Sequence, residues 1–168
     1  MGPDLHPTGG TVMTRAAHAN ALPERGSPKA SSVVGDLAAR HADAVGLCRA
    51  GRHKQAIPQL ADILADCRSV LGPEHLDTLR VSGNLAVACV AAGRRRDGVP
   101  MLTDAVADRS RVLGDEHPET LTARDALAVA YRLAGDADDA AALSAMVTAQ
   151  RTRVLGAGHP DTLTSRMG

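Results

Sequence analysis

Apolar residues recur along the middle of the chain at the spacing of an α-helix. Between residues 77 and 92 they fall at positions i, i+4, i+7 and i+11, and between 96 and 113 they fall at i, i+3 and i+7. A glycine follows each run, as is common at the C-terminus of a helix. The pattern therefore predicts two consecutive helices that end at Gly93 and Gly114. Their buried stripes are formed by Val81, Leu85, Ala88 and Ala92 and by Val99, Leu102 and Val106.

The same pattern repeats every 42 residues. A Val-Leu-Gly segment begins at Val70, Val112 and Val154, and a second glycine marker recurs at Gly51, Gly93 and Gly135. Projection of the two helices by this period predicts further helices over 35–50, 54–71, 119–134 and 138–155. No single helix pair buries its apolar face alone, so the pairs must stack. The predicted domain is a tandem array with units at 35–76, 77–118 and 119–160 and a truncated fourth unit at 161–168.

Both ends of the chain differ from the array. Residues 1–34 are rich in Gly, Pro, Ser and Thr and have no sustained apolar period, so they are predicted to form a disordered leader. The chain stops one turn into what would be another helix. Because solenoids normally need a polar cap, we expect Leu143 and Val147 on the last pair to lack a covering helix. A homodimer through this uncapped pair is one alternative.

The composition narrows the class of partner. The 168 residues are 44% hydrophobic and 23% charged, with 19 basic and 19 acidic side chains. Nucleic acid and anionic membranes require a basic excess, so neither is expected. Cys48, Cys67 and Cys89 form no CxxC pair and indicate free thiols in a reducing compartment. Without an apolar signal segment or a membrane span, we expect a cytoplasmic protein.

Three histidines in register, His75, His117 and His159, raise the question of a metal site. Equivalent positions in stacked pairs lie about 8–10 Å apart or more, whereas zinc ligands lie within about 2.3 Å of the ion. We therefore expect a structural role for them, with no metal and no cofactor. No Ser or Cys nucleophile recurs in register with them, and neither GxxxxGK[ST] nor GxGxxG occurs. The sequence thus predicts no catalytic residues and a non-enzymatic protein.

The repeat resembles the tetratricopeptide repeat in its 42-residue version, found in kinesin light chains and in many bacterial repeat proteins. The positions that carry this resemblance are Leu85-Ala86-x2-Cys89, Gly93 and Gly98 in the second unit and Leu127-Ala128-x2-Tyr131, Gly135 and Ala140 in the third. They favour this family over HEAT and armadillo arrays of similar period. Covering residues 35–166, the resemblance implies an all-α, right-handed superhelical solenoid of three antiparallel helix pairs.

The sequence departs from the family pattern at three positions. Asp43 occupies the place of a buried Leu, so the first helix is expected to be either a polar end-cap or loosely packed. Gly98 replaces the usual Ala at a cost of roughly 1 kcal/mol in a helix interior. Ser144 replaces a large apolar side chain. We therefore expect only modest stability.

In this family the first helix of each pair lines a concave groove that binds peptides. Positions matched to the family place the following residues in that groove: His41, Val45, Cys48, Arg49, Arg80, Gly83, Asn84, Val87, Val90, Thr122, Asp125, Val129 and Arg132. The resemblance implies that Asn84 grips the backbone of a bound peptide.

The expected function is a protein- or peptide-binding scaffold. Three arginines against the single acid Asp125 suit a partner of some acidic character. One alternative is a detached sensor or adaptor arm that works with a separate signalling ATPase. The other is self-assembly through the last helix pair.

Overall fold

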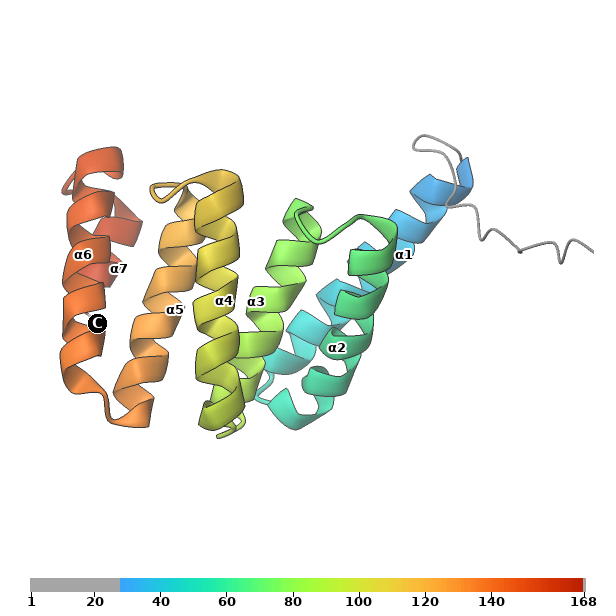
Figure 1. Ribbon diagram of the computed structural model, residues 1–168, viewed down its shortest axis with the longest axis horizontal. Helices are drawn as coiled ribbons and strands as arrows, with labels where there is room; N and C mark the ends of the chain where they lie inside the picture. Colours follow the sequence, from blue (N-terminus) through green and yellow to red (C-terminus); the bar gives the residue numbers. More distant parts are fainter. Residues whose placement is uncertain (1–27, 168) are drawn as a thin grey trace, which may run out of the picture.

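The repeating pattern folds into antiparallel helices that pack in chain order (Figure 1). The computed structural model describes residues 28–167, and this part of the chain contains seven helices and no strand. The predicted leader lies outside the described residues up to position 27. The helices are α1 (Pro28–Arg49), α2 (His53–Val70), α3 (Leu76–Ala91), α4 (Arg95–Leu113), α5 (Pro118–Ala134), α6 (Ala137–Leu155) and α7 (Pro160–Met167). The all-α solenoid predicted from the sequence is confirmed.

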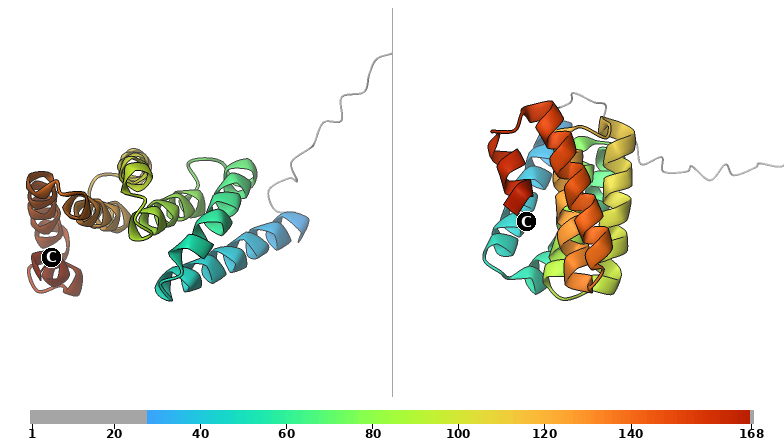
Figure 2. Two further views of the ribbon diagram at one scale, coloured as in Figure 1. Left: turned by 90° about the horizontal axis from the view of Figure 1, so that it is seen from below. Right: turned by 90° about the vertical axis from the view of Figure 1, so that its left-hand side faces the viewer.

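The array is bent along its length. In the view from below, α1 and α7 project to one side while α4 lies on the opposite side (Figure 2). On the concave side α3 contacts both α1 and α5, the first helices of the neighbouring units. The first helices of the three pairs therefore share one face, as the resemblance implied.

The glycine markers end the helices. Gly135 follows α5 in the left-handed conformation, with φ 99°, and its amide bonds to the carbonyl of Tyr131. Gly114 after α4 also has a positive φ, 95°, but its ψ of 158° is extended, a region open essentially to glycine alone. Both positions thus explain why glycine recurs with the repeat, although the two turns differ in shape.

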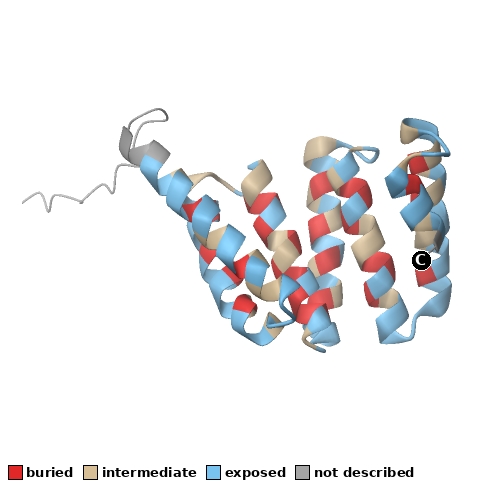
Figure 3. Cartoon of the chain, turned by 180° about the vertical axis from the view of Figure 1, so that it is seen from behind, coloured by how far each residue is buried: buried red, intermediate tan, exposed pale blue. Residues whose placement is uncertain are grey.

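Buried residues recur along every described helix from α1 to α7 (Figure 3). The apolar ones among them are mainly Ala, Leu, Val and Ile. One cluster joins α1, α2 and α3 around Leu60, Ile63 and Val81, and another joins α3, α4 and α5 around Leu102 and Leu127. Burial of such side chains supplies the main stabilising free energy, about 1.5–3 kcal/mol for each large one. Since each cluster spans two units, the stacking of units rather than any isolated pair holds the fold together.

Two expected boundaries are corrected at the ends. Residues 28–34, predicted to belong to the leader, form the first turns of α1. At the other end α7 has eight residues and packs on α6, and Val147 of α6 is 0% exposed. The prediction that Val147 lacks cover is therefore wrong, while Leu143 is half-buried against the second cluster. Thr162 of α7 is buried as well.

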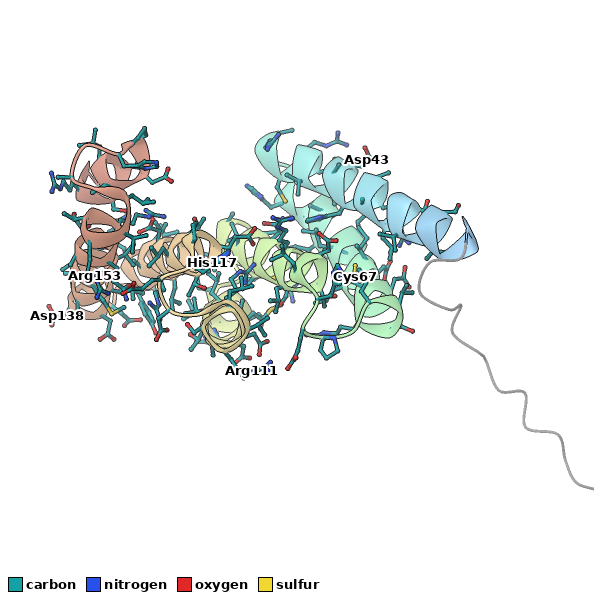
Figure 4. The ribbon with its side chains drawn as sticks, turned by 90° about the horizontal axis from the view of Figure 1, so that it is seen from above. Asp43, Cys67, Arg111, His117, Asp138 and Arg153 are labelled. Atoms are coloured by element: carbon teal, nitrogen blue, oxygen red, sulfur yellow. The ribbon has the colours of Figure 1, made fainter. Side chains whose placement is uncertain are left out.

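The first helix has the polar outer face expected of an end-cap. Asp43, labelled in Figure 4, is exposed on α1. Leu85 and Leu127 in the same repeat position are buried. No unit precedes α1 within the described residues, so this face has no neighbour to pack against. A carboxylate at this position therefore stays hydrated.

Candidate functional site

A cavity of about 360 Å³ opens between the first helices of the three units. Its walls come from α1, α3 and α5, and α4 closes its floor with Leu102 and Arg109. Six residues expected on the concave face from the family positions line it: His41, Arg80, Gly83, Asn84, Val87 and Thr122. Pro118, Glu119, Ala123 and Ala126 line it too. The structure thus brings the centre of the expected groove together in one place.

His41 and Asn84 form a polar contact across the gap between α1 and α3. The Asn84 Nδ2 lies 2.8 Å from the His41 Nε2, so the amide donates to an unprotonated ring nitrogen. Burial lowers the pKa of His41, with Arg80 acting in the same direction and Asp77 opposing both. His41 is consequently a neutral hydrogen-bonding group at neutral pH. Asn84 is therefore held in place by a contact within the protein.

Arg80 reaches from α3 to the start of α5. Its Nε and Nη2 donate to the Oε1 of Glu119 at 2.8 and 2.5 Å. This hydrogen bond and the charge of Glu119 raise the pKa of Arg80. Asp77 adds a longer ion pair with Arg80, at 3.6 Å. The positive charge that the sequence suggested for the groove is thus already neutralised at Arg80.

Arg109 is a buried cation that the sequence analysis missed. It lies on α4 with 5% of its surface exposed. Its Nη1 donates to the carbonyl of Ala105 at 3.0 Å and its Nη2 to the carbonyl of Leu79 at 2.5 Å. Burial lowers the pKa of Arg109, and Glu119 opposes this shift. Analysis of the first helices could not have found it, because it belongs to the second helix of its pair.

The remaining predicted residues lie elsewhere. Val90 was expected in the groove, but it is 7% exposed and belongs to the core cluster with Leu102, so that placement is wrong. Asp125 does not line the cavity either, since it pairs with Arg151 and Ser165 where α7 covers it. Arg132 lines a separate hollow against α6 and α7. Val45, Cys48, Arg49 and Val129 do not contribute to the cavity walls.

The three histidines in register act as helix N-caps. The Nδ1 of His117, which is labelled in Figure 4 at the turn before α5, accepts the backbone N–H of Glu119 at 3.2 Å. His75 and His159 accept the N–H groups of Asp77 and Asp161 at the same distance. Each ring thereby satisfies one of the unpaired donors of a helix start. This local role accounts for the recurrence of histidine, and residues 28–167 contain no group of three metal-ligating side chains.

The cysteines are separate thiols inside the array. Cys67 and Cys89 are buried, Cys48 is half-buried, and all three are free. Burial raises the pKa of each thiol, which disfavours the reactive thiolate. Their environment is that of packing residues.

Comparisons of sequence and of structure both match this chain to tetratricopeptide-type repeats. Sequence profiles of the tetratricopeptide repeat match residues 39–109 and 120–161. Two crystal structures of the nearly identical TPR-like repeats of a candidate kinesin light chain from Podosopora anserina, one of them a variant with a single substitution, superimpose with a TM-score of 0.70 at 30% identity. The matches cover 77% of this chain and 62% and 61% of those chains, so this chain spans about three fifths of their length. The search of curated proteins found no match.

None of the helices described here has the length and hydropathy needed to cross a bilayer.

Proposed function

Because this chain belongs to the tetratricopeptide repeat family, whose repeats generally mediate interactions between proteins on a typically non-enzymatic scaffold, we propose that it binds a peptide segment of a partner protein in the cavity between α1, α3 and α5. The observation that carries this proposal is the convergence of three units on one cavity of about 360 Å³. Its lining includes both apolar and hydrogen-bonding side chains, the combination that fixes a peptide and its orientation.

Val87 supplies the apolar part of the proposed site. It is 42% exposed although it lies on the wall of a cavity. Transfer of such surface from water to a bound side chain contributes about 25 cal/mol for each Å² that is buried. Asn84 and Arg80 supply the polar part, and both are held by partners within the protein. Groups that are already oriented lose little conformational freedom on binding, which favours affinity.

A peptide selection with a matched pair of variants tests this proposal. Random peptides displayed on phage are selected on the immobilised protein, and the selected peptides are measured by titration calorimetry against Val87→Glu and Val129→Glu. These two valines occupy the same repeat position and are equally exposed, at 42%, but only Val87 lines the cavity. We expect Val87→Glu to weaken binding by about tenfold or more, as a carboxylate in an apolar contact does, and Val129→Glu to leave it unchanged.

Equal loss in both variants, or in neither, would contradict the proposed site. Circular dichroism of the two proteins controls for unfolding. The other expectations from the sequence stay predictions: a cytoplasmic location, no contact with nucleic acid or membrane, and the alternatives of a sensor arm for a separate ATPase or of self-assembly.

A further inference from the structure

A buried arginine recurs in the second and third units, but its hydrogen-bonding partners differ between them. Arg109 and Arg151 occupy the same position of the 42-residue repeat, and both are 5% exposed. Arg151 forms an ion pair with Asp125 and donates to the hydroxyl of Ser165. The residues that correspond to these two partners beside Arg109 are Gly83 and Ala123. One repeat therefore carries a carboxylate and a hydroxyl for its buried cation, and the other carries neither.

The missing carboxylate leaves Arg109 with backbone partners. The hydrogen bonds of its guanidinium within residues 28–167 go to the carbonyls of Ala105 and Leu79. Glu119 lies near enough to affect its charge, but the Oε1 of Glu119 accepts from Arg80. A guanidinium carries five N–H donors, so Arg109 retains donor capacity. A buried charge without an ionic partner is costly, and a counter-ion relieves that cost.

The space beside Arg109 opens to the cavity. Arg109, Gly83 and Ala123 all line it. A Cβ atom on Gly83 would lie 2.6 Å from the Arg109 Nη2, so the guanidinium rests on the bare backbone of Gly83. In the third unit the equivalent Asp125 presents its carboxylate to Arg151. A carboxylate that entered the cavity would meet Arg109 as Asp125 meets Arg151.

We propose that the cavity binds the side-chain carboxylate of an acidic residue of the partner peptide through Arg109. This inference rests on the proposed function and names the group that the site recognises. The side chain, rather than the end of a chain, is chosen because an Asp side chain fills the equivalent place in the next unit. Arg–carboxylate hydrogen bonds are charge-assisted and strengthen away from water, so the buried position of Arg109 favours this contact.

The first test uses sodium propionate, which mimics an acidic side chain. Propionate is titrated into the ¹⁵N-labelled protein at constant ionic strength, with sodium chloride as the balancing salt, and the Gly83 amide and Arg109 Nε resonances are followed by NMR. We expect saturable shifts with a dissociation constant on the order of 10 mM, since propionate has few atoms to contribute binding energy. The Arg151 Nε, already paired with Asp125, should not shift. Absence of saturable shifts at Gly83 and Arg109 would overturn the proposal.

Substitutions at Gly83 and Asp125 exchange the surroundings of Arg109 and Arg151. Gly83→Asp supplies the missing carboxylate internally, and it should abolish the propionate shifts and raise the urea midpoint relative to Gly83→Asn, which fills the same volume without charge. A Cβ atom on Gly83 would meet the guanidinium of Arg109, a side-chain end that must shift in both variants alike. Conversely, Asp125→Gly frees Arg151 and should create a second propionate site there. Arg96→Gln removes an exposed arginine outside the cavity and should change nothing. Propionate binding that persists in Gly83→Asp would contradict the proposal.

Binding measurements with altered peptides distinguish a failure of this inference from a failure of the proposed function. In a peptide that Val87→Glu fails to bind, each Asp or Glu is replaced by its amide. We expect one such replacement to weaken binding to the wild type about tenfold, the usual effect of losing one charge-assisted hydrogen bond, and to have no effect on Arg109→Met. If Val87→Glu blocks binding but no replacement matters, the cavity binds peptides and the role of Arg109 is wrong. If propionate binds at Arg109 but Val87→Glu leaves the affinity for peptides unchanged, the proposed function fails and the carboxylate site stands.

Discussion

Gly98 of α4 lies against Val90 of α3 with no room for a side chain between them. A Cβ atom on Gly98 would be 2.6 Å from the Val90 Cγ2 and 2.8 Å from its backbone nitrogen. The equivalent positions in the other two units are Ala56 and Ala140, both buried. The cost of Gly98 to helix propensity therefore comes with a packing requirement, because the close approach of α3 and α4 leaves no room for a Cβ atom.

Gly98→Ala should destabilise the protein even though alanine is the better helix former. Alanine gains roughly 1 kcal/mol in helix propensity, but overpacking against a backbone atom costs about 1–3 kcal/mol and forces the two helices apart. We expect a lower midpoint of unfolding in urea. The matched control is Gly46→Ala in α1, where a Cβ would meet nothing within 4 Å. That variant should be more stable by up to about 1 kcal/mol, and a stabilised Gly98→Ala would contradict this account of the packing.

His117→Ala should lower stability by removing the N-cap of α5. Its Nδ1 accepts the backbone N–H of Glu119, and loss of such a cap costs about 0.5–2 kcal/mol. His117→Asn keeps an acceptor of similar reach and should recover most of that free energy in urea unfolding. If Asn and Ala unfold at the same midpoint, the hydrogen bond contributes nothing.

The 42-residue period predicted the helices because each one is bounded by residues that recur with it. Histidine caps and positive-φ glycines define helix ends locally, so those ends can be read without tertiary information. The site was harder to predict. Val87 and Val90 are both apolar residues of α3, and tertiary packing distinguishes them. Val90 lies against Gly98 and in the cluster with Leu102, whereas Val87 stays exposed.

Arg109 was missed although its signal was present in the sequence. The expected groove positions came only from the first helix of each pair, and Arg109 lies on the second. A comparison of the repeats in register would have shown that Arg109 and Arg151 recur while Gly83 replaces Asp125. The converse case is Asp125, which the family positions placed in the groove, whereas in the structure it pairs with Arg151 and with Ser165 of α7.

Stability should fall as the pH drops through the range in which histidine titrates, and His41 should account for part of that fall. Its pKa is lowered in the folded state, mainly by burial, so the unfolded chain takes up the proton first. The stabilisation is complete above the ordinary histidine pKa of about 6.5 and is lost as the pH falls towards the lower folded pKa. His41→Gln keeps an acceptor for Asn84 and does not titrate, so its free energy of unfolding should change less between pH 7.5 and 5.5, a range of about two units around that pKa. Identical pH profiles in urea would show that His41 does not contribute.

A chain that ends at Gly158 should be less stable and should self-associate. It lacks α7, so Arg151 loses the hydroxyl of Ser165 and the carbonyl of Asp161, and Thr148 loses the carbonyl of Ser165. Loss of these hydrogen bonds and of the cover on α6 should cost at least about 1–3 kcal/mol in urea unfolding. Sedimentation should show concentration-dependent dimers of the shortened chain, because the exposed face of α6 gains a partner by stacking on a second copy. Ser165→Ala retains α7 and should lose less stability without any change in association, and a shortened chain that stays monomeric would show that α7 does not prevent stacking.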